Sequence, residues 1–207
     1  MKYTYNVITP VTRFENLTKL INLLEPMKVN WHVITDTSLG WRPAFPNQRW
    51  INQWTCPNTE VEFWKRCNFS INWFLNHFVH TRPESERWCI LNDDDAYEAD
   101  FFEKVDKHDG DLVICSMERG HHTPAGVDPV RAHGFTKLIA APEYMHPGYV
   151  GVEQAIVSGT IIKGTRLPLA PAGDGEWIEW MVANHKAEYA PEANVLFNYF
   201  EPGRWDK

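Results

Sequence analysis

The stretch YTYNVITPVTRFENLTKLINLLEPMKVNWHVIT, residues 3–35, predicts the fold. Residues 3–9 alternate polar with apolar side chains and are rich in β-formers, so they predict a strand that ends at Pro10. Apolar residues recur at helical spacing between residues 14 and 24, and residues 31–35 predict a second strand. Strand–helix–strand units build parallel sheets with the connecting helix on one face. The sequence therefore predicts an α/β protein.

The rest of the chain continues this alternation of strands and helices. We expect a long loop with short strands over 37–60, a helix over 60–80, a buried strand over 87–92, a short helix over 98–106 and a strand over 111–116. Later elements are a loop over 117–135, strands over 136–141 and 154–163, an amphipathic helix over 173–187 and a β-like segment over 194–200. No internal repeat or low-complexity linker divides the chain, which predicts one domain.

Composition excludes several classes of protein. The 207 residues are 43% hydrophobic and 23% charged, which is typical of a globular domain rather than a disordered or fibrous chain. The 20 Lys and Arg against 27 Asp and Glu give a net charge of −7, which argues against broad binding to a nucleic-acid backbone. No run of 18 apolar residues predicts a membrane span. The start of the chain lacks the apolar core of a signal peptide, and the four cysteines form no CxxC pair, so we expect a reduced, cytoplasmic protein.

Three consecutive carboxylates, Asp93, Asp94 and Asp95, directly follow the apolar strand over 87–92. At an effective dielectric constant of about 20, two such charges about 6 Å apart repel by a little under 3 kcal/mol. A bound divalent cation removes that cost, and oxygen ligands suit Mg²⁺ or Mn²⁺. A solvated acidic turn is the alternative, because Asp is common in turns.

The ends of the predicted parallel strands place further polar residues beside this triplet. In open α/β sheets, ligands bind beyond the carboxyl ends of the strands. Thr9 and Arg13 follow the first strand, and Asp36 follows the second. A nucleotide needs acceptors for its base or ribose, a cation for its diphosphate and donors nearby, and this edge is expected to supply all three.

Four segments in register resemble the GT-A-fold glycosyltransferases, in particular the inverting glucuronyltransferases and small family-2-like enzymes. They are ITPVTR at 8–13, WHVITD at 31–36, RCNFSINW at 66–73 and NDDDAY at 92–97, and beyond residue 100 the likeness narrows to 158–160 and 174–177. The resemblance implies a single GT-A, Rossmann-like domain with a mostly parallel central sheet flanked by helices. Residues 1–100 would be its nucleotide-binding half, and 101–207 its donor-sugar and acceptor half.

The resemblance also implies the ligands and the residues that bind them. Pro10, Thr12 and Asp36 would line the uracil or ribose pocket of a UDP-sugar, with UDP-glucose or UDP-galactose favoured. The full nucleotide-binding set would be Thr9, Pro10, Val11, Thr12, Arg13, Asp36, Arg66, Asn68, Asp93 and Asp94. Asp95 and Asp93 would hold Mn²⁺ or Mg²⁺, with the diphosphate completing its shell.

This sequence departs from the glucuronyltransferase pattern in two places. Cys67 stands where those enzymes have an Arg, and Arg66 lies one residue earlier. Their C-terminal Trp-His segment has no counterpart here.

The predicted helix over 173–187 begins with candidate bases. An inverting transfer needs a carboxylate to deprotonate the acceptor hydroxyl. Asp174 is the first candidate and Glu176 the second, because family-2-like enzymes carry their base at such a helix start. A helix N-cap is the structural alternative for Asp174.

Other residues are candidates for the donor-sugar or acceptor subsite. Ser158, Gly159 and Trp177 belong to the weaker part of the resemblance, and Gly159 serves either close approach of the sugar or a bulge. Trp41, Trp50 and Trp54 are expected either to floor an acceptor sugar subsite or to lie in the core. His121, His122 and His133 lack a zinc-ligand spacing and are interpreted as loop residues.

These observations predict a metal-dependent, inverting glycosyltransferase that moves a hexose from a UDP-sugar to a glycan or another hydroxyl acceptor. Two alternatives remain. A nucleotidyltransferase shares the nucleotide-binding sheet, although residues 9–13 lack the Gly that its triphosphate loop usually has. A non-catalytic Trp-rich glycan-binding module needs no acidic triplet.

Overall fold

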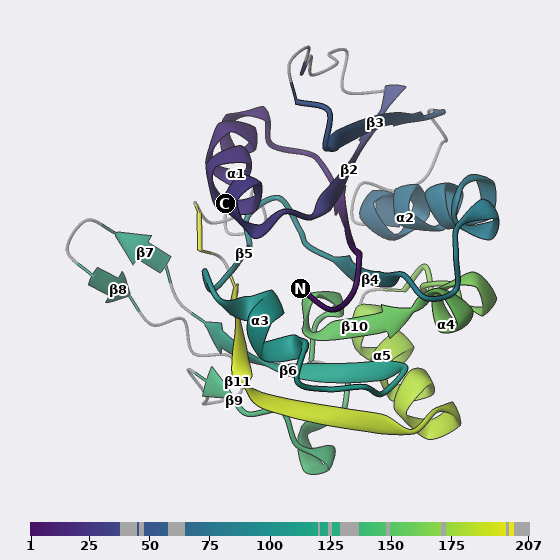
Figure 1. Ribbon diagram of the computed structural model, residues 1–207. Helices are drawn as coiled ribbons and strands as arrows, with labels where there is room; N and C mark the ends of the chain where they lie inside the picture. Colours follow the sequence, from purple (N-terminus) through teal and green to yellow (C-terminus); the bar gives the residue numbers. More distant parts are fainter. Residues whose placement is uncertain are drawn as a thin grey trace.

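A mixed β-sheet flanked by helices on both faces forms the body of the computed structural model (Figure 1). The structure describes residues 1–37, 45, 48–57, 65–119, 121–123, 126–128, 137–147, 150–170, 173–197 and 199–200. Its strands are β1 (Tyr5–Pro10), β2 (Asn30–Asp36), β3 (Ile51–Cys56), β4 (Arg87–Ile90), β5 (Ala96–Tyr97), β6 (Leu112–Arg119), β9 (Lys137–Leu138), β10 (Ala155–Ser158) and β11 (Ala187–Phe197). A separate hairpin pairs β7 (His121–Thr123) with β8 (Gly126–Asp128).

The helices are α1 (Leu17–Leu24), α2 (Arg66–His77), α3 (Phe101–Val105), α4 (Gly159–Gly164) and α5 (Gly173–Asn184). Short 3₁₀ helices are η1 (Phe14–Asn16), η2 (Glu25–Met27), η5 (Val79–Thr81), η6 (Pro142–Tyr144) and η7 (Val152–Gln154). None of these described helices is long and apolar enough to cross a membrane.

The sheet is parallel in one half and mixed in the other. Its strand order is β3-β2-β1-β4-β10-β6-β11-β5, with β9 paired to β6. Strands β3, β2, β1 and β4 run parallel, which confirms the predicted strand–helix–strand unit. The chain enters β10 from η7, at the carboxyl edge of β4, so β10 runs antiparallel to both β4 and β6. The sheet is therefore mixed and curled, and only its first four strands match the Rossmann-like expectation.

Two apolar cores lie on the two faces of this sheet. Strand residues alternate between them: Val7 and Cys89 join α1 and α3 on one face, whereas Ile8 and Ile90 join α2, α4 and α5 on the other. Figure 1 shows α1 and α3 on one side of the sheet and the other three helices on the opposite side. Because both faces are covered, every residue of β1 and β4 is buried, including the polar Asn6 and Thr9.

Several predicted elements have different boundaries in the structure, and three of these differences concern the mixed half of the sheet. The strand expected over 154–163 ends at Ser158, whose hydroxyl accepts a hydrogen bond from the Ile161 N–H and caps α4. Strand β11 starts at Ala187 rather than 194, because a bulge between Ala190 and Asn194 accommodates Pro191. The loop expected over 117–135 contains the end of β6 and the β7–β8 hairpin.

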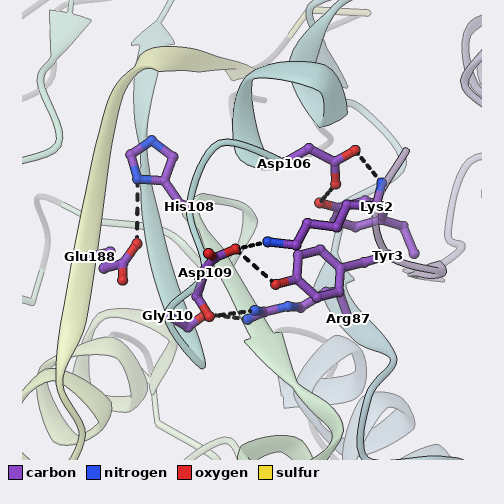
Figure 2. A network of polar contacts seen from close by, with 9 residues as sticks. Lys2, Tyr3, Arg87, Asp106, His108, Asp109, Gly110 and Glu188 are labelled. Atoms are coloured by element: carbon purple, nitrogen blue, oxygen red, sulfur yellow. Dashed lines mark hydrogen bonds and ion pairs between the residues drawn. The ribbon is translucent and has the colours of Figure 1, made fainter.

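The amino edge of the sheet is tied together by a polar network (Figure 2). The Asp109 carboxylate accepts hydrogen bonds from Lys2 Nζ and, at 3.1 Å, from the Tyr3 hydroxyl. Arg87, at the start of β4, donates to the carbonyls of Asp109 (3.0 Å) and Gly110. Lys2 and Asp109 are exposed, so their ion pair contributes little stability. This network joins β1 and β4 to the turn before β6, at the edge opposite to the acidic triplet.

Candidate active site at the carboxyl edge of the sheet

The carboxyl ends of β1 and β4 bring Thr12, Arg13 and Asp93 into direct contact. Asp93 Oδ2 accepts hydrogen bonds from the backbone N–H groups of Thr12 (2.6 Å) and Arg13 (2.6 Å) and from the Thr12 hydroxyl (3.1 Å). Asp93 Oδ1 pairs with Arg13 Nη1. Burial raises the pKa of the Asp93 carboxyl, and the Arg13 guanidinium opposes that rise. Both Asp93 oxygens are therefore used in fixing the loop after β1.

Arg13 also holds Asp94. Its Nη1 lies 3.0 Å from Asp94 Oδ1, so one buried guanidinium serves two neighbouring carboxylates. The Asp94 carbonyl accepts a hydrogen bond from the Phe200 N–H at 2.9 Å. Residue 200, after β11, is thereby placed directly beside the triplet.

Asp95 and Glu153 form the innermost part of the site. Both side chains are buried, and the Asp95 carboxyl lies within hydrogen-bonding reach of Glu153. Asn92 Nδ2 donates to Glu153 Oε1, whereas Glu153 Oε2 has no hydrogen-bond partner among the described residues. Burial, followed by the charge of Asp174, raises the pKa of Glu153 to about 7. We call Asp93, Asp94, Asp95 and Glu153 the acidic cluster.

Glu153 is the residue that sequence reasoning missed. It lies in η7, and the carboxyl group packs over the Cα of Gly151, where a Cβ would collide with Oε2. Its only signal was a single acidic side chain in the otherwise mostly apolar run 150–157. The antiparallel pairing of β10 with β4 brings it to Asn92, and local sequence does not encode that pairing.

The carboxylates of the acidic cluster fit a divalent cation that prefers oxygen ligands and that a bound substrate also helps to hold. Among the described residues, no three His, Cys, Asp or Glu side chains are arranged as a ready metal cage. Mg²⁺ in phosphate sites is usually held by only one or two carboxylates, with water and substrate oxygens completing its shell. Asp95 and Glu153 are the carboxylates suited to this role, since Glu153 Oε2 is buried without a partner. Asp93 is not, because Arg13 and Thr12 engage both of its oxygens.

A narrow pocket lies next to the acidic cluster, between the ends of β1 and β2 and the start of α2. Its open volume is about 10 Å³, and its walls are Pro10, Val11, Thr12, Ile34, Asp36, Arg66, Cys67 and Ser70. This volume holds about one water molecule. A nucleotide base is larger than this volume, so it does not fit inside the pocket as it stands. The pocket nevertheless groups five predicted nucleotide-binding residues: Pro10, Val11, Thr12, Asp36 and Arg66.

Asp174 and Glu176 lie in the first turn of α5 and differ in their surroundings. The charge of Asp174 acts on the buried Glu153 carboxyl, so Asp174 lies beside the acidic cluster. Glu176 is exposed. Two side chains of α2 hold the segment before α5: Asn68 Nδ2 donates to the Pro168 carbonyl at 3.0 Å, and Asn72 bonds both the N–H and the carbonyl of Leu167. Asn68 thus positions this segment, a role different from the predicted contact with a nucleotide.

Several other predicted site residues lie away from the acidic cluster. Ser158 pairs with Arg87 at the amino end of β4, so Ser158 and Gly159 occupy the opposite edge of the sheet. A Cβ on Gly159 would lie 2.6 Å from the Pro83 carbonyl oxygen, so this glycine permits close approach of backbone rather than of a sugar. Thr9, by contrast, lies near the carboxyl end of β1, and its buried hydroxyl accepts a hydrogen bond from the Trp31 indole at 2.8 Å. Ser158 and Gly159 are therefore not part of the site, and the Thr9 side chain bonds a core residue.

The tryptophans do not form one sugar-binding floor. Trp177 is buried in the core, where its indole N–H donates to the Thr165 hydroxyl at 2.5 Å. Trp50 packs against the α1 side of the sheet, and Trp54 against the α2 side. Trp41 and His133 lie outside the described residues, as do the side chains of His121 and His122.

Comparison with known proteins supports the fold. No protein-family model matches the sequence, and no significant relative is found among curated proteins. The structure is similar to that of S. aureus TarS 1-349, with a TM-score of 0.62 and 14% identity over 94% of this chain and 60% of that one. A second structure of S. aureus TarS gives a TM-score of 0.64 and 13% identity, covering 96% of this chain and 37% of that chain. The chain therefore has a fold similar to that of TarS and spans less than two thirds of the length of either TarS chain.

Proposed function

We propose that this protein is a metal-dependent glycosyltransferase that transfers a hexose from a UDP-sugar to an acceptor hydroxyl with inversion. The observation that carries the proposal is the acidic cluster at the carboxyl edge of a sheet whose fold is similar to that of TarS. Within this cluster the Glu153 carboxylate is buried, and one of its oxygens has no hydrogen-bond partner among the described residues. The diphosphate of UDP carries negative charge as it leaves the sugar, and a cation beside it stabilises that charge. The acidic cluster consists of carboxylates, which are ligands that Mn²⁺ or Mg²⁺ prefers.

Each part of the site has a role in this proposal. Asp95 and Glu153 would hold the cation, which supplies Lewis-acid stabilisation of the departing UDP. Arg13 and Asp93 keep the loop after β1 in place. Thr12, Asp36 and Arg66, around the narrow pocket, would contact the uridine of a donor such as UDP-glucose or UDP-galactose.

Asp174 is the proposed general base. It takes the proton from the acceptor hydroxyl while that oxygen attacks the anomeric carbon, and the bond from this carbon to the UDP oxygen breaks. The charge of Asp174 acts on the Glu153 carboxyl, which places this candidate base beside the proposed cation site.

A panel of UDP-sugars with Mn²⁺ tests the function. Release of UDP in the presence of a hydroxyl acceptor supports the proposal. Release of pyrophosphate would instead identify a nucleotidyltransferase, and retained glycan binding without turnover would identify a binding module.

Substitution of the base gives a sharper test. We expect Asp174→Asn to bind UDP normally and to lower kcat by about 10²–10⁴-fold, because the amide cannot accept the proton. Glu176→Gln, two residues away and exposed, is the matched control and should keep near-normal kcat. The opposite pattern in steady-state kinetics would assign the base to Glu176.

A further inference from the structure

A second pocket, remote from the acidic cluster, lies on the α2 face of the sheet. Its volume is about 360 Å³, within the usual range of small-molecule sites. Its walls include the aromatic rings of His32, Trp54, Phe74, Phe78 and Trp88. We call it the aromatic pocket.

Helix α2 separates the two pockets. Its first turns, with Arg66, Cys67 and Ser70, line the narrow pocket at the carboxyl edge. Phe74, near its end, and Phe78, just after it, line the aromatic pocket. Ser70 and Phe74, the nearest lining residues of the two pockets on this helix, are about 6 Å apart along its axis. The two pockets share no lining residue.

The aromatic rings are held in fixed positions by buried polar contacts. The Trp54 indole N–H donates to His32 Nδ1 at 3.2 Å, and His32 Nε2 lies 3.3 Å from Asn6 Oδ1. His32 also stacks on Trp54 and Trp88, with ring centroids 6.3 and 5.5 Å away. A rigid wall of this kind can bind a flat ring without losing side-chain entropy.

Trp88 lies beneath the surface of the pocket. Its side chain is fully buried, so its indole N–H, which has no hydrogen-bond partner among the described residues, does not face the open volume of the pocket. The groups that a ligand can reach are therefore on the more exposed lining residues.

The polar part of the wall indicates which ligand fits. It consists of the amides of Asn30 and Asn52, the Thr81 hydroxyl and the guanidinium groups of Arg49 and Arg82, and no carboxylate is among the lining residues that the structure describes. An alkyl ligand would leave these groups without partners. A bare anion would make no use of the rings.

Arg82 retains binding capacity although it forms an ion pair. Glu86 accepts from Arg82 Nε at 3.1 Å and from Nη2 at 2.6 Å. The two N–H donors on Arg82 Nη1 are not used by this pair. Together with Arg49, they give the pocket an excess of positive charge.

We propose that the aromatic pocket binds an acidic monosaccharide, a sugar ring that bears a carboxylate or a phosphate. The aromatic walls pack against the apolar face of the ring, the amides bind its hydroxyls, and Arg49 and Arg82 bind its anionic group. This site lies outside the proposed transfer site, and its occupation does not require catalysis.

Trp indole resonances in ¹⁵N-labelled protein provide the test. Glucuronate, glucose 6-phosphate, glucose, inorganic phosphate and uridine are titrated separately. We expect glucuronate or glucose 6-phosphate, or both, to shift the Trp54 and Trp88 signals with one saturation curve. The Trp180 signal, from an exposed ring on α5, should stay unchanged. We expect glucose to bind about tenfold more weakly than the acidic sugar, and phosphate and uridine to leave both signals in place.

Two variants make the result specific. Arg49→Gln changes an exposed side chain and should weaken acidic-sugar binding about tenfold without changing glucose binding. Trp54→Leu should abolish both, whereas Trp180→Leu, the matched control, should abolish neither. The proposal would be overturned if neither acidic sugar moved the Trp54 and Trp88 signals, or if glucose bound as tightly as the acidic sugars. Undiminished binding of the acidic sugar in Arg49→Gln would overturn it as well. Asp95→Asn should keep this binding, so a failed UDP site and a failed aromatic pocket give different results.

Discussion

Arg13 and Asp93 form the most constrained pair at the carboxyl edge. The carboxylate joins two strand ends that are 80 residues apart in sequence, and it does so with two backbone N–H donors and one guanidinium. An uncompensated carboxylate buried this deeply is costly, so each partner depends on the other.

Removal of Arg13 should therefore destabilise the fold as well as the site. We expect Arg13→Met to lower the free energy of unfolding by about 3–5 kcal/mol, because Asp93 loses its charged partner. Asp93→Asn keeps an acceptor for the Thr12 and Arg13 N–H groups and should cost less. In urea denaturation, the double variant should lose less than the sum of the single variants. Simple additivity would show that the pair is not coupled.

His32 gives a pH dependence whose sign follows from its burial. Desolvation lowers the pKa of His32 from 6.5 to about 3, and Trp54 donates to its Nδ1, which requires the neutral ring. The unfolded chain binds this proton more readily, so the stabilising contribution of His32 is complete above pH 6.5 and is lost as pH falls towards 3. Between pH 7.5 and 5 the loss should be about 2 kcal/mol. His32→Gln should lack this part of the pH dependence in chemical denaturation, and an unchanged slope would contradict the assignment.

At the scale of elements, the direction of β10 decides which residues meet. The apolar run around 155–162 predicted a strand, but the pattern carries no information on whether that strand runs parallel or antiparallel to its neighbours. Because β10 is antiparallel to β4, its start brings Glu153 to Asn92, and its end takes Ser158 to the far edge. This pairing alone places Ser158 and Gly159 at the edge of the sheet opposite to the acidic cluster, away from the predicted donor site.

Helix α4 offers a matched pair of glycines that tests the packing of this element. A Cβ at Gly159 would lie 2.6 Å from the Pro83 oxygen and 2.8 Å from the Glu84 Cα, both backbone atoms, whereas a Cβ at Gly164 meets nothing within 4 Å. We expect Gly159→Ala to destabilise the protein by about 1–3 kcal/mol and Gly164→Ala to change stability by less than about 1 kcal/mol. Equal melting temperatures for the two variants would contradict this packing.

For the whole molecule, the sequence predicted the parallel half and the position of the acidic triplet. Local patterns suffice there, because each of these strands is a short segment with its own apolar pattern and the three aspartates directly follow one of them. The mixed half depends on pairings between distant segments, such as β6 with β11, which periodicity cannot reveal. Glu153 reaches the acidic cluster through such a long-range contact, whereas the aromatic pocket is lined by residues of the parallel half and its neighbouring helix. For Arg13 and Asp93, the sequence predicted a position at the same edge of the sheet, but not the buried ion pair that they form.

Isothermal titration of UDP, with and without Mn²⁺, tests whether the acidic cluster binds a sugar nucleotide through a cation. We expect the wild-type protein to bind UDP with Mn²⁺ at least tenfold more tightly than without it. Asp95→Asn should lose this dependence on the cation, while Glu176→Gln should retain it. Two results would contradict the proposal that the acidic cluster binds a sugar nucleotide through a divalent cation. One is a heat of UDP binding that does not depend on Mn²⁺, and the other is an Asp95→Asn variant that binds UDP and Mn²⁺ as the wild type does.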